Sequence, residues 1–176
     1  MDWSTQIKVV NKKCFSAIAS MYPYKNILSV DSRIKLVNAY VFSRLNYASI
    51  VWLNKPTSFV KNKVNKIVRS AARFVLDKKK FDHVTDDINL VLEWLNCKYR
   101  FQYEILVFCL KINRELCPNY FVNYIHLDNI TSKSTRNNYY FRPTIQFNTH
   151  WGERSIRYIG PLLWLNLPDD LKDLSL

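Results

Sequence analysis

Glycine is nearly absent from this chain of 176 residues, since only Gly152 and Gly160 occur. Glycine adopts positive φ angles at no steric cost, so a chain that lacks it makes few tight turns cheaply. Hydrophobic residues make up 48% of the sequence, which is enough to supply a core for one domain or two small ones. We therefore expect a mainly α fold in which helices are joined by ordinary loops.

The stretch from Phe59 to Lys80 carries the clearest helical pattern. Its apolar residues recur with a period near 3.6 and form one stripe: Val60, Val64, Ile67, Val68, Ala71, Ala72 and Val75. Basic residues fall on the opposite face or follow the C-terminal end: Lys61, Lys66, Arg69, Arg73, Lys78, Lys79 and Lys80. The pattern predicts a helix that packs with one side and presents positive charge on the other.

Two further helical patterns precede this stretch. Residues 4–22 have apolar residues at helical spacing and end at Pro23, and a second helix is expected to be capped by Asp31 or Ser32. Three helices with short connections favour a compact bundle over residues 1–80. Most aromatic residues fall on apolar stripes, so we expect these to be core: Tyr40, Tyr47, Trp52, Trp94, Tyr99 and Tyr103.

The rest of the chain is expected to form two further parts. In residues 81–127, a helical connector, Thr85 can cap one helix, and a longer one follows from about Lys98 to Leu116 with Tyr99, Tyr103, Leu106, Val107 and Leu110 on one side. Residues 128–176 are expected to be loop-rich. A small β-hairpin formed by residues 139–147 and 155–159 is expected there, and Gly160-Pro161 is expected to interrupt the regular secondary structure after it.

The excess of positive over negative charge lies entirely in the first half of the chain. Residues 1–80 carry 16 Lys and Arg against three acids, whereas residues 81–176 carry ten against eleven. Such an asymmetry favours a localised surface for a polyanion, with nucleic acid as the first candidate and an anionic membrane face as the second. A solvated charged face explains the residues alone equally well. If nucleic acid binds, Lys and Arg along a helix contact phosphates and do not read bases.

A second, smaller contact is predicted beside the polar segment that follows residue 128. Arg136, Tyr140 and Arg142 combine basic and aromatic side chains, and aromatic rings stack on bases or ribose. The ordinary alternative is that these aromatic residues pack in the protein. The segment therefore stays a secondary candidate.

No catalytic or metal-binding motif is found. The cysteines at positions 14, 97, 109 and 117 form no zinc-finger spacing with the three histidines, and buried free thiols in a reducing compartment are the expected state. Thr85-Asp86-Asp87 is similar to the x-Asp-Asp box of reverse transcriptases, but it opens a helical pattern and lacks flanking apolar strands. We expect no catalytic residue, no metal ligand and no cofactor in this chain.

The N-terminus has no signal-peptide pattern, and no uncharged run spans a bilayer, so we expect an intracellular protein that is not secreted and has no membrane partner.

The order of short motifs along the chain resembles one known family. They include Leu45-Asn46-Tyr47-Ala48-Ser49, Trp94-Leu95 with Arg100, Pro118-Asn119-Tyr120-Phe121, Ser134-Thr135-Arg136 and Trp164-Leu165-Asn166-Leu167-Pro168. This series is similar to the region after the catalytic palm in non-LTR retrotransposon reverse transcriptases, with the insect Jockey-like branch nearest in character. The family usually has Asp where Asn46 stands, Gln at Asn65 and Asn at Arg69. Leu165 also takes the place of an Asn.

The resemblance implies a thumb-like bundle and a C-terminal segment of an RNA-directed DNA polymerase, without its palm. RNA or an RNA–DNA hybrid and a palm domain would be its partners, and the catalytic Mg²⁺ would belong to that palm. The chain would then be no enzyme by itself, and the resemblance is compatible with the nucleus. Two alternatives stay open: a protein-interaction module whose basic amphipathic helix docks in a groove, and a non-functional retrotransposon remnant.

Overall fold

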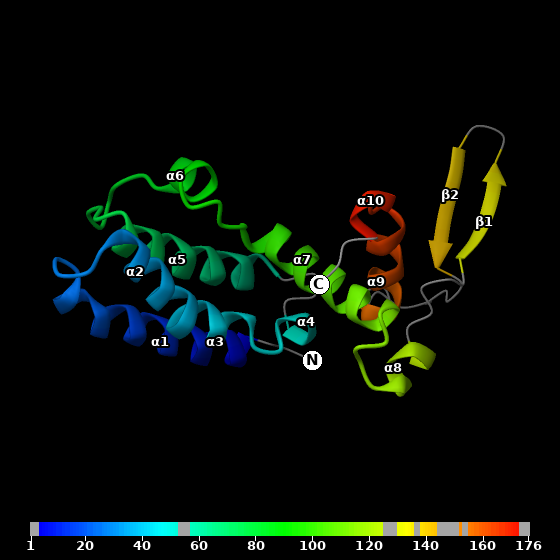
Figure 1. Cartoon of the computed structure of the whole chain (residues 1–176), viewed down its shortest axis with the longest axis horizontal. Helices are drawn as coiled ribbons and strands as arrows, with labels where there is room; N and C mark the ends of the chain where they lie inside the picture. The colour runs from blue at the N-terminus through cyan, green and yellow to red at the C-terminus, as the bar shows by residue number, and fades with distance from the viewer. Residues whose placement is uncertain are drawn as a thin grey trace. The chain divides into compact units, whose positions relative to one another are not determined.

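The computed structural model describes residues 4–52, 57–124, 130–135, 138–143, 152 and 155–172. These residues are mainly helical, which confirms the predicted fold class (Figure 1). The chain divides into two compact units, Met1–Arg100 and Phe101–Leu176. The division into residues 1–80, 81–127 and 128–176 stays a prediction.

Three helical segments pack together in the first unit. They are α1 (Ser4–Met21), α5 (Ser58–Val75), and a continuous segment in which α2 (Val30–Val37) passes through a π turn (Asn38–Phe42) into α3 (Ser43–Asn46). A short helix, α4 (Ser49–Trp52), follows. Figure 1 shows α1, α2 and α5 lying side by side. Ser29 caps α2 by accepting a hydrogen bond from the Ser32 amide at 3.2 Å. The predicted caps, Asp31 and Ser32, are therefore wrong, because both residues lie inside the first turn of the helix.

The apolar stripe predicted for α5 is confirmed. All seven of its residues are buried, and Phe74 adds an eighth buried side chain. Thr57 begins the helix, because its hydroxyl accepts a hydrogen bond from the Val60 amide at 3.4 Å. Burial of this stripe against α1 and α2 fixes which face of α5 remains exposed.

Helices α6 (Thr85–Leu90) and α7 (Cys97–Asn113) occur near their predicted positions. Thr85 does not cap α6, because the cap position is Val84. The predicted face of α7 is wrong: its buried residues are Cys97, Phe101, Ile105, Cys109 and Ile112. Asn96 caps α7, since its side-chain oxygen accepts hydrogen bonds from the amides of Lys98 and Tyr99 at 3.0 and 3.2 Å.

Four of the tyrosines predicted to be core are more than half exposed. They are Tyr40, Tyr47, Tyr99 and Tyr103, with Tyr47 the most exposed at 77%. Tyr47 lies in the turn after α3, and the segments that carry the other three bury different residues, such as Val41 beside Tyr40 and Phe101 beside Tyr99 and Tyr103. Trp94 is half-buried and packs edge-on against Phe42, with ring centroids 4.7 Å apart. The Trp52 side chain lies outside the described residues.

Among the described residues, four that are not glycine adopt positive φ angles, each in a turn near the end of a helix. They are Ala48, Asp77, Glu93 and Glu115, with φ between 52° and 58°. After α7, the amide of Leu116 donates to the Lys111 carbonyl and the amide of Glu115 to the Ile112 carbonyl, at 2.9 and 3.0 Å. This pair of bonds is the Schellman motif, in which glycine usually holds the left-handed position. The left-handed turns in the described part of the chain are therefore made without glycine, the residue best suited to them.

Besides most of α7, the described residues of the second unit form short helices and a hairpin. The helices are α8 (Asn119–Tyr124), α9 (Ile156–Leu165) and α10 (Asp169–Lys172). Strands β1 (Ile130–Thr135) and β2 (Asn138–Pro143) pair antiparallel. The predicted hairpin partner 155–159 is wrong, because Ser155 caps α9 by accepting from the Arg157 amide at 3.3 Å. The predicted break at Gly160-Pro161 is also wrong, since both residues lie inside α9.

Candidate nucleic-acid interface

A groove in the first unit gathers six of the seven basic residues predicted from the sequence. Its volume is about 920 Å³. Its lining comprises Phe15, Tyr22, Lys25, Lys66, Arg69, Ser70, Arg73, Asp77, Lys78, Lys79 and Lys80. Asp77 is the one acid among these described lining residues. Such a concentration of cations along one depression is suited to a polyanion.

Two local features bring these residues together. Lys66, Arg69 and Arg73 are three and four positions apart on α5, so they share the face opposite the buried stripe. The chain then turns sharply at Asp77, whose φ is 58°, and the amide of Lys78 donates to the Arg73 carbonyl at 3.0 Å. This turn returns the three consecutive lysines to the groove that the helix lines.

Lys25 belongs to the groove and was missed from the sequence. It follows the 3₁₀ turn Tyr22–Tyr24, and its ammonium forms an ion pair with the Asp77 carboxylate. The Lys25 side chain is only 14% exposed. The hydrogen bond and charge of Lys25 lower the pKa of Asp77, so this carboxylate stays ionised and is neutralised by Lys25. The two residues are far apart in the sequence, and no local pattern links them.

Arg73 and Lys78 are held by contacts within the protein. Arg73 donates two hydrogen bonds to the Asp82 carbonyl oxygen, at 3.2 Å from Nε and 3.0 Å from Nη2. Lys78 Nζ lies 2.6 Å from Asp87 Oδ2 and 3.2 Å from the His83 carbonyl oxygen. The hydrogen bond from Lys78 is the main cause that lowers the pKa of Asp87. These contacts fix the loop after α5, and they reduce what Arg73 and Lys78 can offer to a ligand.

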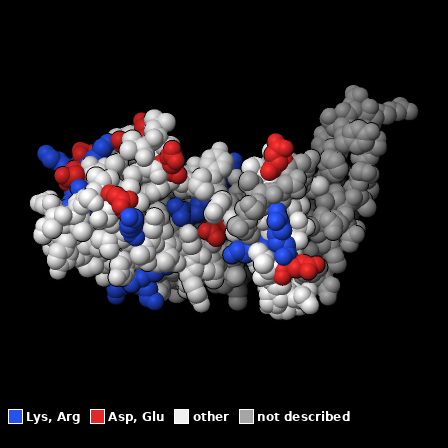
Figure 2. All heavy atoms as spheres, in the orientation of Figure 1, with Lys and Arg blue, Asp and Glu red and all other residues white. Residues whose placement is uncertain are grey.

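Lys66, Arg69, Lys79 and Lys80 are exposed, and for these four no carboxylate partner occurs in the part of the chain that the structure describes. Lys80 Nζ lies 5.4 Å from the ring centroid of Phe81, which is 89% exposed. On the face drawn in Figure 2, basic and acidic side chains are intermixed over the first unit, so its positive charge is not a uniform coat. Because their side chains are exposed and have no carboxylate partner among the described residues, Lys66 and Arg69 of α5 and Lys79 and Lys80 of the following turn are the cations most available to a ligand.

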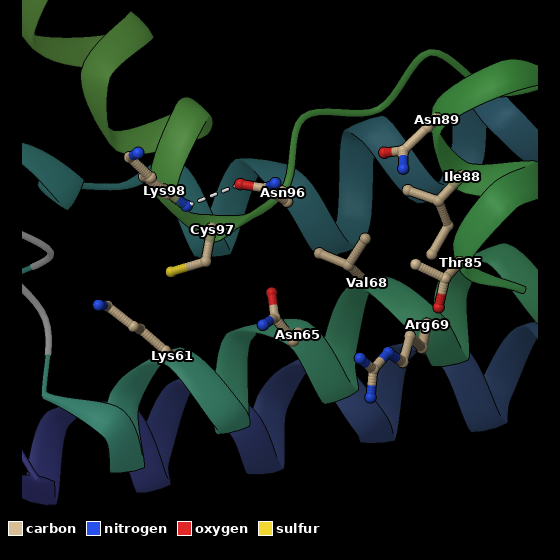
Figure 3. Close-up of a pocket in the computed structure, with 10 residues that line it drawn as sticks. All are labelled: Lys61, Asn65, Val68, Arg69, Thr85, Ile88, Asn89, Asn96, Cys97 and Lys98. Atoms are coloured by element: carbon tan, nitrogen blue, oxygen red, sulfur yellow. Dashed lines mark hydrogen bonds between the residues drawn. The ribbon is translucent and has the colours of Figure 1, made fainter.

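The seventh predicted residue, Lys61, lies elsewhere. It lines a separate pocket between α5, α6 and the start of α7, and Figure 3 shows its side chain among those of Asn65 and Cys97. Of the secondary contact, Arg136 lies outside the described residues. Tyr140 and Arg142 lie in β2, where they pair with Lys133 and Thr131, and their side chains are not described. The prediction for these three residues stands as made.

Three of the four cysteines are buried, as expected, and Cys117 is half-buried. Burial raises the pKa of Cys14 to about 11 and that of Cys109 to about 12, so both thiols are protonated at neutral pH. The described residues contain no group of three or more His, Cys, Asp or Glu side chains placed to hold a metal ion. Thr85, Asp86 and Asp87 begin α6, in agreement with the helix-start interpretation of this acidic pair. In the described part of the chain, no helix has the length and apolar character needed to cross a bilayer.

Comparisons with known proteins identify no relative. No family model, no curated protein and no solved structure matches this chain.

Proposed function

We propose that the first unit binds RNA or an RNA–DNA hybrid through phosphate contacts in the basic groove. The observation that carries this proposal is the gathering of six predicted cations, from α5 and the following turn, around one groove with a single neutralised acid. Lysine and arginine on a helix face bind the sugar–phosphate backbone and fix its register without reading sequence.

The proposed context is a non-catalytic part of a reverse transcriptase. The sequence resembles the thumb and C-terminal region of non-LTR retrotransposon enzymes, and thumbs lie along the primer–template duplex. The palm domain would supply the catalytic aspartates and Mg²⁺, and this chain would bind the primer–template duplex. Both the partner domain and the nuclear site of action belong to this proposal.

Fluorescence anisotropy with a labelled blunt RNA–DNA hybrid tests the groove. If four to six phosphates are contacted, the logarithm of the affinity should fall against the logarithm of salt concentration with a slope of about −3 to −5. The double variant Lys66→Glu with Arg69→Glu should weaken binding strongly. Lys63→Glu on the same helix is the matched control, because Lys63 does not line the groove. Absence of binding at low salt, or binding that does not depend on salt, would overturn the proposal.

The burial of α5 weighs against the protein-interaction alternative. A helix that docks in a partner's groove presents an apolar face, read at i, i+3, i+4 and i+7. Val64, Ile67, Val68 and Ala71 are all buried within the first unit. The face of α5 that remains is polar and basic, which favours a polyanion over an apolar groove.

A further inference from the structure

A second pocket in the first unit shares Arg69 with the basic groove (Figure 3). Its volume is about 350 Å³, and three elements build it. Helix α5 contributes Lys61, Asn65, Val68 and Arg69, α6 contributes Thr85, Ile88 and Asn89, and the start of α7 contributes Asn96, Cys97 and Lys98. Because Arg69 lines both depressions, the pocket adjoins the groove at this residue.

The pocket has an apolar floor and a rim of amides. Val68, Ile88 and Cys97 are buried, whereas most of the polar lining residues are exposed. In Figure 3 the amides of Asn65 and Asn89 extend into the space between α5 and the segment above it. An asparagine side chain carries a donor and an acceptor side by side, which is the complement of a base edge. The oxygen of Asn96 already accepts the amides of Lys98 and Tyr99, so Asn96 offers a ligand its NH₂ donors.

The charge of the pocket is wholly positive. Lys61, Arg69 and Lys98 line it, and none of its ten described lining residues is acidic. The thiol of Cys97 adds no negative charge, because burial raises its pKa, although Lys61 and Arg100 act in the opposite direction. Cations that surround amides and a small apolar floor suit a ligand with a phosphate at one end and a flat heterocycle at the other.

We propose that this pocket holds a single unpaired nucleotide at the end of the strand bound in the groove. Its phosphate lies against Arg69, the residue that the pocket shares with the groove, and its base covers the apolar floor with its edge toward the amides. Lys61 and Lys98 line the other end of the pocket (Figure 3). Ligand pockets commonly have volumes of about 300 to 1,000 Å³, so this one, at the low end, accommodates one nucleotide and not a longer segment. The inference rests on the proposed function and names the part of the nucleic acid that this pocket takes.

The test compares blunt RNA–DNA hybrids with hybrids that carry a single-nucleotide overhang at either the 3′ or the 5′ end. An overhang at one of the two ends should strengthen binding about fivefold, the effect of about one net hydrogen bond. The double variant Asn65→Leu with Asn89→Leu should lose this gain and bind the blunt hybrid as before. Asn62→Leu is the matched control, because Asn62 is an exposed asparagine of α5 that lines neither depression. Equal affinity for blunt and overhanging hybrids, or a gain that survives in the double variant, would overturn the inference.

A measurement with 5′-AMP separates this inference from the proposed function. In nuclear magnetic resonance spectra, 5′-AMP should shift the side-chain amide signals of Asn65 and Asn89 more than adenosine or inorganic phosphate does at the same ionic strength. Thermal melting of each variant shows whether it folds. Salt-dependent binding of the blunt hybrid without a response to 5′-AMP would support binding in the groove and refute the nucleotide pocket. An AMP response without hybrid binding leaves a nucleotide pocket and removes the proposed function.

Discussion

Arg100 Nη1 donates a hydrogen bond to Asn46 Oδ1 at 3.1 Å, across 54 residues of sequence. The same guanidinium lies 4.3 Å from the ring centroid of Phe42, and Arg100 is only 8% exposed. The π turn Asn38–Phe42 and the short helix after it supply both partners. A nearly buried cation is thus held by an aromatic face and an amide.

Asn46→Asp should stabilise the first unit. A carboxylate in place of the amide accepts a charge-assisted hydrogen bond from Arg100, which is stronger than the neutral bond that it replaces. We expect the free energy of unfolding in urea to rise by about 1 kcal/mol. The control is the same substitution in an Arg100→Met background, where the gain should disappear. A loss of stability in the variant that retains Arg100 would contradict this account of the pair.

The Lys78–Asp87 ion pair should make stability depend on pH in the acid range. Lys78 lowers the pKa of Asp87 below its ordinary value of 3.8, so the folded state binds a proton less readily than the unfolded state. The pair therefore stabilises the protein fully above the ordinary carboxyl pKa, and this contribution is lost as the pH falls through the lowered value. Asp87→Asn should be less stable than the wild-type chain at about pH 7, and the difference should shrink toward about pH 3.

Urea unfolding at both pH values measures this effect. Asp31→Asn is the control, because the Asp31–Lys35 pair has both side chains more than 70% exposed and a pair so exposed contributes little. A difference between wild type and Asp87→Asn that is the same at both pH values would show that Asp87 acts by something other than its charge.

The α5 face could be predicted because its sequence allows one solution. Its stripe is continuous and its other positions are mostly charged or polar, so only one rotation of the helix about its axis buries the apolar residues. Helix α7 has apolar and aromatic residues nearly all round. The predicted stripe with Leu106 and Leu110 and the observed stripe with Ile105 and Cys109 both repeat at helical spacing, and packing decided between them.

The groove could be predicted only in part, because the packing of separate segments, which no local pattern reveals, completes it. Lys66, Arg69 and Arg73 follow from the periodicity of one helix. The ion pair that adds Lys25 to the groove, and the carbonyl of Asp82 that holds Arg73, depend on how separate segments meet. The pocket beside Lys61 needed three elements to come together, and its only advance signal was a set of asparagines with no assigned role.

Lys79→Gln and Arg73→Gln should separate binding from stability. The Lys79 side chain is exposed, whereas Arg73 holds the Asp82 carbonyl by two hydrogen bonds. Lys79→Gln should lose one phosphate contact, which should make the salt slope of hybrid binding shallower by about 0.7 to 0.9. Its free energy of unfolding should stay unchanged. Arg73→Gln should lower the free energy of unfolding by about 1 to 2 kcal/mol. If Arg73→Gln left unfolding unchanged and only weakened binding, Arg73 would be a phosphate contact and not a brace for the loop.

Glu115→Gly should stabilise the second unit, because Glu115 holds the left-handed position of the Schellman motif after α7 with a φ of 57°. Glycine removes the clash of the side chain with the backbone, although it also loses more conformational freedom on folding. We expect a net gain of about 0.5 to 1 kcal/mol in the free energy of unfolding. Asp77→Gly is the informative counterpart: Asp77 holds the same kind of turn with a φ of 58°, but its carboxylate pairs with Lys25. The backbone gain at Asp77 should therefore be offset by an unpaired, largely buried lysine, and equal stabilisation at the two positions would show that the Lys25–Asp77 pair contributes nothing.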